Sequence, residues 1–178
     1  MYYSAASARG ARVRRSLRAF TSSLSVARVG QGALDEGVIP VAVSVFDRGI
    51  PGVRKLDRDL YGALQRAAVD AEADGVELLV NSGWRSPEYQ RRMFDRAVLK
   101  YGSREEAARW VATAETSAHV LGEAVDVGPP DAAAWLGEHG AAYGLCQIYA
   151  NEPWHYELRP GAVEPMYADP TEDPRMRS

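Results

Sequence analysis

The apolar positions in the first half of the chain are spaced as in a strand, a helix and a second strand. Residues 38–46 form the first apolar run and predict a strand interrupted at Pro40, which has no N–H to donate. Leucine and alanine recur at helical spacing over residues 56–71 and the pattern ends at Gly75, which predicts a helix with a glycine stop. Residues 76–80 are short and mostly apolar, so we predict a buried strand there.

The second half of the chain continues this alternation. Ser86 and Pro87 are typical of a helix start, because serine caps a helix and proline fits its first turn. Apolar residues between Tyr89 and Ala97 then supply the stripe that such a helix buries. We also predict helices over residues 104–112 and 131–143 and strands over 145–149 and 154–158.

Length and composition indicate one ordinary domain with a substantial core. The chain has 178 residues, of which 46% are hydrophobic and 25% charged, and we find no internal repeat. Its single cysteine, Cys146, excludes an internal disulfide framework, and we interpret it as a packed strand residue. We divide the chain into a flexible leader (1–34), a folded domain (35–160) and a proline-rich, loosely ordered tail (161–178).

Charge is distributed unevenly along the chain. The net charge is -3, yet six arginines and no acid precede Asp35, so the remainder has 15 basic and 24 acidic side chains, a balance of -9. An acidic domain argues against nucleic acid as a partner. We interpret the basic leader as a solvated tail, with contact to anionic membrane or wall polymer as the alternative. No stretch is apolar enough for a signal core or a transmembrane segment.

Two histidines and an aspartate have the chemistry of a catalytic zinc site. His119 lies seven residues before Asp126, and His155 lies in the last predicted strand. In the predicted strand around Asp126, alternation puts Asp126 and Ala124 on one face, where small residues leave room for a metal and a substrate. Two imidazoles and a carboxylate leave one zinc position open for water, so we predict a zinc-dependent hydrolase.

Glu152, three residues before His155, is the candidate general base. Glu157, one strand period beyond His155, is the competing candidate for the base or for a partner of the histidine. His139 lies in a polar stretch, and we do not interpret it as a ligand. The structural alternatives are that Asp126 caps the following helix, that Glu152 is a turn carboxylate and that Arg85 forms a surface ion pair.

At these residues the chain resembles a known family. The motifs are Ser82-Gly83-Trp84-Arg85-Ser86 with Gln90, Ser117-x-His119-x-x-Gly122-x-Ala124-x-Asp126, and Glu152-x-Trp154-His155. They are similar to the motifs of the zinc D-alanyl-D-alanine carboxypeptidases of the VanY type, which are relatives of the hedgehog-like metallopeptidases. The resemblance covers about residues 76–158, which places a zinc peptidase domain within residues 35–160.

The resemblance implies a fold, a site and a substrate. The fold is α+β, an antiparallel sheet with packed helices. Zinc is held by His119, Asp126 and His155, and Glu152 is the catalytic base. Arg85, Gln90 and Ser117 lie near the substrate, where Arg85 either grips a terminal carboxylate or steadies the oxyanion. The substrate is the peptidoglycan stem peptide, whose terminal amide is hydrolysed, and the family leads us to expect a place in the cell envelope or outside the cytoplasm.

Three other readings remain open from the sequence. Two are related cleavages, by an L,D-carboxypeptidase or by an endolysin-like L-alanyl-D-glutamate endopeptidase. The third is of another class, a zinc-stabilised binding module without turnover. Glu152 favours an enzyme over the module, because a binding module has no use for a carboxylate beside an open metal position.

Overall fold

The structure is a computed structural model that describes residues 30–159 and 166–176. Nearly all of the predicted leader, residues 1–29, lies outside the described residues. Its last residues begin the short helix α2, Gln31–Asp35, so ordered structure starts inside the segment that we expected to be flexible. Among the described helices, none combines the length and the apolar character needed to cross a membrane.

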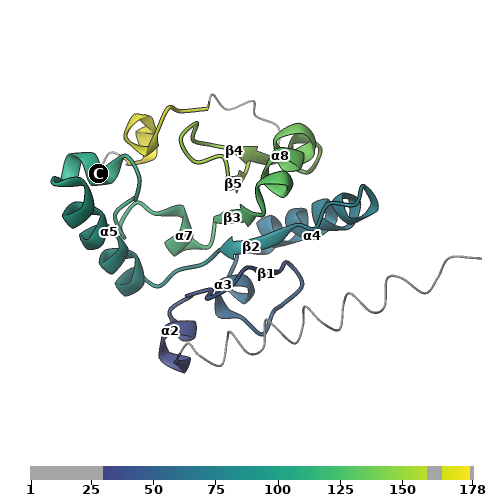
Figure 1. The fold of residues 1–178 in the computed structure, drawn as a ribbon, viewed down its shortest axis with the longest axis horizontal. Coiled ribbons are helices and arrows are strands. Elements are labelled where there is room, and N and C mark those ends of the chain that lie inside the picture. The colour runs from purple at the N-terminus through teal and green to yellow at the C-terminus, as the bar shows by residue number, and fades with distance from the viewer. Residues whose placement is uncertain (1–29, 160–165, 177–178) are drawn as a thin grey trace, which may run out of the picture.

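An antiparallel sheet forms the centre of the described domain (Figure 1). Its strand order is β1-β2-β3-β5-β4, and every neighbouring pair is antiparallel. The strands are β1 Val43–Ser44, β2 Leu79–Ser82, β3 Ala124–Gly128, β4 Leu145–Gln147 and β5 His155–Leu158. The expected α+β fold with an antiparallel sheet and packed helices is confirmed.

Helices connect these strands and begin at the residues that cap them. The Asp57 side chain accepts hydrogen bonds from the backbone of Asp59 and Leu60 at the start of α4, and the Ser86 side chain accepts one from Tyr89 at the start of α5. The helices beyond α2 are α3 Pro51–Arg54, α4 Arg58–Ala73, α5 Pro87–Tyr101, α6 Arg104–Ala108, α7 Ala118–Leu121 and α8 Pro130–His139, with 3-10 turns η1 Gly140–Tyr143, η2 Pro170–Glu172 and η3 Pro174–Met176.

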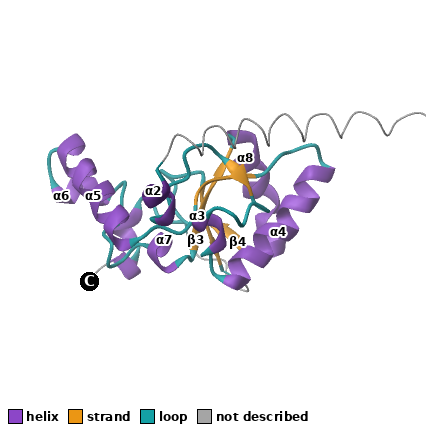
Figure 2. Cartoon of the chain, turned by 90° about the horizontal axis from the view of Figure 1, so that it is seen from below, coloured by secondary structure: helices purple, strands orange, loops and turns teal. Residues whose placement is uncertain are grey.

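The main hydrophobic core lies between one face of the sheet and helices α4 and α8 (Figure 2). Val125 and Val127 of β3 and Tyr156 of β5 belong to this core. Because side chains alternate along a strand, Asp126 and His155 project from the opposite face. A second, small cluster of Phe94, Ala97 and Ala107 joins α5 to α6. The sheet thus has one apolar face for stability and one face free for chemistry.

Several predicted elements are shorter than expected. The strand predicted over 38–46 is reduced to Val43–Ser44, which pairs with β2 alone at the edge of the described sheet. The strand predicted over 76–80 is shifted to Leu79–Ser82, because pairing with β3 extends as far as Ser82. The helix predicted over 104–112 ends at Ala108, and the carbonyl of Ala112 accepts a hydrogen bond from Gln90 instead of continuing a helix.

The proline-rich tail is more ordered than predicted. Tyr167 exchanges backbone hydrogen bonds with Ile148 and Ala150, at 2.9 and 2.8 Å, and so runs beside the end of the fourth strand. The Asp169 side chain accepts from the backbone of Thr171 and starts a 3-10 turn. Composition alone, from which we expected loose order, does not reveal these local caps in residues 166–176.

The glycine that ends α7 is locked against a neighbouring loop. Gly122 and Gly102 both end helices with positive φ, +79° and +88°, but a Cβ at Gly122 would meet the carbonyl oxygen of Lys55 at 2.6 Å, whereas one at Gly102 meets nothing within 4 Å. We expect Gly102→Ala to lower the free energy of unfolding by about 1–2 kcal/mol from left-handed strain alone. Gly122→Ala should cost about 2–5 kcal/mol, because the backbone of Lys55 must also move.

Denaturant unfolding of the two variants measures this difference. Equal losses of stability would contradict the view that the turn between α7 and β3 is fixed against residue 55.

Candidate metal centre

Three different elements supply the three candidate ligands. Asp126 of β3 and His155 of β5 are directly paired across the sheet, on the face opposite the core. His119 lies on the short helix α7, and the turn at Gly122 leads from that helix into β3. All three side chains are buried. The fold therefore brings together residues that are up to 36 positions apart.

The three ligand atoms have the spacing that a tetrahedral ion requires. His119 Nε2 lies 3.3 Å from Asp126 Oδ1 and 3.3 Å from His155 Nδ1, and His155 Nδ1 lies 3.2 Å from Asp126 Oδ1. Bonds of about 2.0–2.2 Å to one tetrahedral ion place its ligand atoms about 3.3–3.6 Å apart. The residues present therefore fit a tetrahedral metal ion with one further position.

The second nitrogen of each histidine ring fixes which nitrogen faces the ion. His119 Nδ1 lies 2.8 Å from the carbonyl oxygen of Gly83, and His155 Nε2 lies 3.3 Å from Glu157 Oε1. Both partners accept hydrogen bonds, so in the neutral rings these nitrogens carry the protons. The lone pairs of His119 Nε2 and His155 Nδ1 then point at the carboxylate of Asp126. Three electron-rich atoms in contact require a cation among them.

The pKa values of the three residues also indicate that the site needs a positive charge. Burial alone would raise the pKa of Asp126, but His119, His155 and Arg85 together hold it well below its usual range. Burial and the charge of Arg85 lower the pKa of His119. Burial also works against the charged form of His155, but hydrogen bonds to Asp126 and Glu157 outweigh it and raise the pKa of His155 to about 9. With no metal bound, the carboxylates on either side of His155 thus favour its charged form.

The two candidate bases lie on opposite sides of His155. Glu152 Oε2 is 3.7 Å from Nδ1, the nitrogen that faces the site, whereas Glu157 meets Nε2 on the far side. Burial raises the pKa of Glu152 to about 7, partly offset by His155. Glu157 is fully buried and paired with Arg159 and Arg175. Glu152 therefore faces the open side of the site, and Glu157 supports the histidine from behind.

Arg85 is tied to the site by three side-chain hydrogen bonds. Its Nη2 donates to Asp126 Oδ2 at 2.7 Å, its Nε to Ser82 Oγ at 2.8 Å and its Nη1 to Gln90 Oε1 at 3.1 Å. Ser82 is itself the strand neighbour of Asp126. The amide nitrogen of Gln90 donates to the carbonyl of Ala112, which fixes the amide oxygen in place as an acceptor for Arg85. The guanidinium is thereby fixed beside the candidate ligand rather than paired at the surface.

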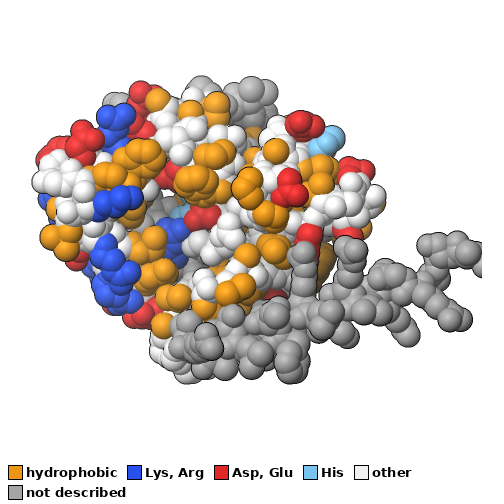
Figure 3. Space-filling view, in the orientation of Figure 1, with side chains coloured by type: hydrophobic (Ala, Val, Ile, Leu, Met, Phe, Trp, Pro, Cys, Tyr) orange, Lys and Arg blue, Asp and Glu red, His pale blue; other side chains and the backbone are white. Residues whose placement is uncertain are grey.

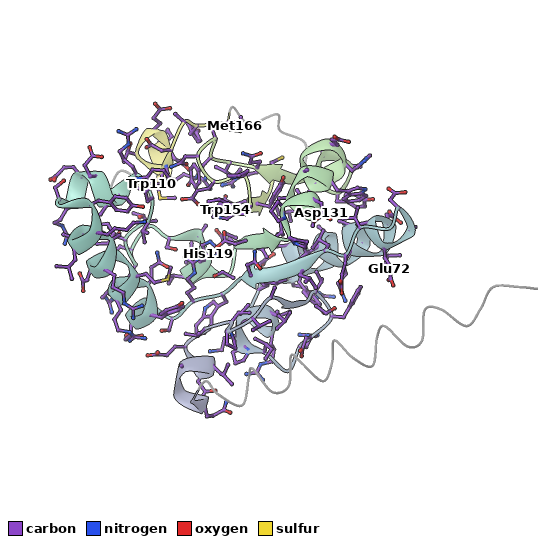
Figure 4. The ribbon with its side chains drawn as sticks, in the orientation of Figure 1. Glu72, Trp110, His119, Asp131, Trp154 and Met166 are labelled. Carbon is purple, nitrogen blue, oxygen red and sulfur yellow. The ribbon has the colours of Figure 1, made fainter. Side chains whose placement is uncertain are left out.

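A cleft of about 450 Å³ opens over these residues. Its lining includes every candidate site residue except Glu157, with Ser117 among them. Trp110 and Trp154, both partly exposed, line the same cleft as His119 (Figure 4). The space-filling view shows this face hollowed near its centre, with basic, acidic and histidine side chains at the bottom (Figure 3). Charged groups therefore lie at the floor of the cleft and aromatic groups at its rim.

The remaining histidine is outside the site. His139 is exposed, and its ring packs 4.6 Å from that of Trp135. Sequence reasoning assigned no role to Ser82, although it stands in the first motif, nor to Tyr149, whose ring lies 5.1 Å from that of His155. Periodicity could have placed Ser82 beside Asp126 only if the strand pairing had been known.

The antiparallel sheet carries Asp126 and His155, and α7 places His119 beside them at the floor of a cleft. The fold is that of the hedgehog-like DD-peptidases, as the solved structures below show. Residues 53–160 match the family described as VanY, D-alanyl-D-alanine carboxypeptidase, and the chain belongs to this family. It is 31% identical over 143 residues to a D-alanyl-D-alanine carboxypeptidase of Enterococcus faecalis (strain ATCC 700802 / V583), an alignment that covers 66% of this chain and 53% of the relative. The chain thus spans about half the length of that relative.

Solved structures share the fold. A zinc-bound variant of the vancomycin-resistance D,D-pentapeptidase VanY is 31% identical with a TM-score of 0.54, over 58% of this chain and 72% of the other. VanYB in complex with D-alanine-D-alanine gives the same identity and a TM-score of 0.55, over 58% and 71% of the two chains. The LD-carboxypeptidase LdcB is 26% identical with a TM-score of 0.55, over 69% and 67%.

Proposed function

We propose that this protein is a zinc-dependent D-alanyl-D-alanine carboxypeptidase that hydrolyses the terminal amide of peptidoglycan stem peptides. The observation that carries the proposal is the convergence of two imidazole nitrogens and a carboxylate oxygen beside Glu152, at the floor of a cleft. The family and the two relatives at 31% identity support this substrate class.

His119, Asp126 and His155 are the residues that would hold the zinc ion. Nitrogen and oxygen donors in this number suit zinc, and their spacing leaves a fourth position facing the cleft. The chemistry that zinc supplies in such a site is Lewis acidity, which polarises a carbonyl and lowers the pKa of water toward about 7. Gly83 and Glu157 hold the two imidazole rings in the orientation that this requires.

Glu152 is the general base of the proposed reaction. Its carboxylate accepts the proton of the attacking water and then delivers it to the leaving amine. In the metal-free protein burial raises the pKa of Glu152 to about 7, which shows that this carboxyl group is largely withdrawn from water beside the site. A binding module without turnover would not need a buried carboxylate at this place.

Arg85 has donors left for the substrate. A guanidinium has five N–H donors, and three of them are used on Asp126, Ser82 and Gln90. The remaining donors can grip the terminal carboxylate of the substrate in a charge-assisted pair. Gln90 holds the guanidinium in place, and Ser117 lies in the cleft beside His119, near the substrate.

The two carboxylates beside His155 can be separated by mutation. We expect Glu152→Gln to keep its zinc affinity while turnover falls by about 10²-fold or more, because the residue moves a proton but binds no metal. Glu157→Gln should instead lower zinc affinity by about 10–100-fold, because it supports a ligand.

Chelator competition and turnover at saturating zinc measure the two effects. An active Glu152→Gln together with a zinc-loaded but inactive Glu157→Gln would show that the base has been assigned to the wrong carboxylate.

The position of the cleaved bond and the binding of the terminal carboxylate by Arg85 can be tested with the same substrates. Incubation with a muropeptide ending in D-alanyl-D-alanine should release free D-alanine, identified by mass. Amidation of the terminal carboxylate removes the partner of Arg85 and should lower kcat/KM by about 10–150-fold, since such a pair contributes about 1.5–3 kcal/mol. Arg85→Lys, which keeps the charge but loses the planar fork, should show a smaller penalty on amidation.

Each other product points to a different reaction. Removal of D-alanine only from a tetrapeptide identifies an L,D-carboxypeptidase, and a released internal fragment identifies an endopeptidase. Equal amidation penalties in the wild type and in Arg85→Ala, which removes the charge, would show that Arg85 does not bind the terminal carboxylate.

A further inference from the structure

The segment 166–176 lies beyond the region that matches the family, residues 53–160, and yet it contacts the metal centre's surroundings. It runs back beside the turn that carries Glu152 (Figure 1). The backbone of Asn151 donates to the carbonyl of Ala168 at 3.2 Å, directly before Glu152. Pro170 and Met176 also line the cleft. The segment is therefore part of the wall of the site.

Arg175 in this segment binds the carboxylate that supports His155. Its Nη1 lies 2.7 Å from Glu157 Oε2, and Glu157 Oε1 in turn lies 3.3 Å from His155 Nε2. The side chain of Glu157 is only 2% exposed, so a charge there requires partners. Arg159 is the second partner. Arg175 thus stabilises the charge to which His155 donates its ring proton.

Asp173 provides a second route from the same segment to His155. Its carboxylate is fully buried and accepts a hydrogen bond from the hydroxyl of Tyr149 at 3.1 Å. The Tyr149 ring lies 5.1 Å from the His155 ring, at an angle of 33°. Asp173 also accepts from Arg175 Nε at 3.0 Å. His155 therefore has two neighbours that this segment holds in place. Glu157 accepts from His155 Nε2 and is bound by Arg175, and the Tyr149 ring packs on the His155 ring and is bound by Asp173.

We propose that residues 166–176 are a positioning segment of the metal centre, in which Arg175 orients His155 through Glu157 and Asp173 orients it through Tyr149. This inference rests on the metal site of the proposed function. Loss of Arg175 leaves Glu157 with Arg159 alone, so its carboxylate is a weaker and less fixed acceptor for His155. The segment then sets metal affinity although none of its residues is a ligand.

Zinc affinity of the full-length protein tests this role. We expect Arg175→Met to weaken zinc binding by about 10–100-fold in chelator competition, and Arg175→Lys to recover part of the loss. The matched control is Arg91→Met, which removes an arginine whose ion-pair partners among the described residues are the exposed carboxylates of Glu88 and Glu115, and which should leave zinc affinity unchanged. The absorption spectrum of the cobalt-substituted protein should change in Arg175→Met and not in the control.

A double-mutant cycle separates positioning from general stability. If Arg175 acts through Glu157, its replacement by Met should have little further effect on zinc affinity in a Glu157→Gln background. An equal loss in both backgrounds overturns the route from Arg175 through Glu157, because the effect would then not pass through that carboxylate. If Arg175→Met does not fold, Arg175→Lys replaces it in the same cycle.

The outcome also separates this inference from the proposed function. If the wild-type protein binds no zinc, both the proposed function and the role of the segment are wrong. A wild-type protein that binds zinc, with Arg175→Met and Arg175→Lys equal to it in affinity and cobalt spectrum, overturns only the role of the segment.

Discussion

The site depends on one electrostatic constraint, the contact of three electron-rich atoms. His119 Nε2, His155 Nδ1 and Asp126 Oδ1 lie 3.2–3.3 Å from one another in a buried place. The partial negative charges on these three atoms repel one another unless a cation lies among them. The fold brings these atoms together because Asp126 and His155 are paired across two strands and the turn at Gly122, tight against Lys55, leads from α7 into β3.

The surrounding residues orient the charges of this centre. Arg85 donates to the second oxygen of Asp126, Gly83 accepts from one imidazole and Glu157 from the other. Each partner leaves a ligand atom free on the side of the cleft. The apolar face of the sheet holds the strands from behind, with Val125, Val127 and Tyr156 in the core. Stability and chemistry are thus assigned to opposite faces of the same strands.

The ligand set could be proposed from the sequence because each candidate ligand stands in a short motif of compatible residues. Helix α4 was also predictable, since its apolar period and glycine stop are local signals. The roles of Glu152 and Glu157 were not separable, because they depend on which ring nitrogen of His155 faces the site. The predicted length of the edge strand β1 was too great, because its length depends on how many residues pair with its one neighbour, β2. Arg175 gave no signal, because its partner is reached only through the folding of the tail.

The central claim is that His119, Asp126 and His155 bind one zinc ion together, and X-ray absorption at the zinc edge of the loaded full-length protein tests it most directly. We expect a shell of nitrogen and oxygen ligands at about 2.0–2.1 Å with the outer-shell scattering of two imidazoles. That imidazole scattering should decrease in His119→Ala. A sulfur ligand at about 2.3 Å, which only Cys146 or a methionine of this chain could supply, or a shell without imidazole, would contradict the account.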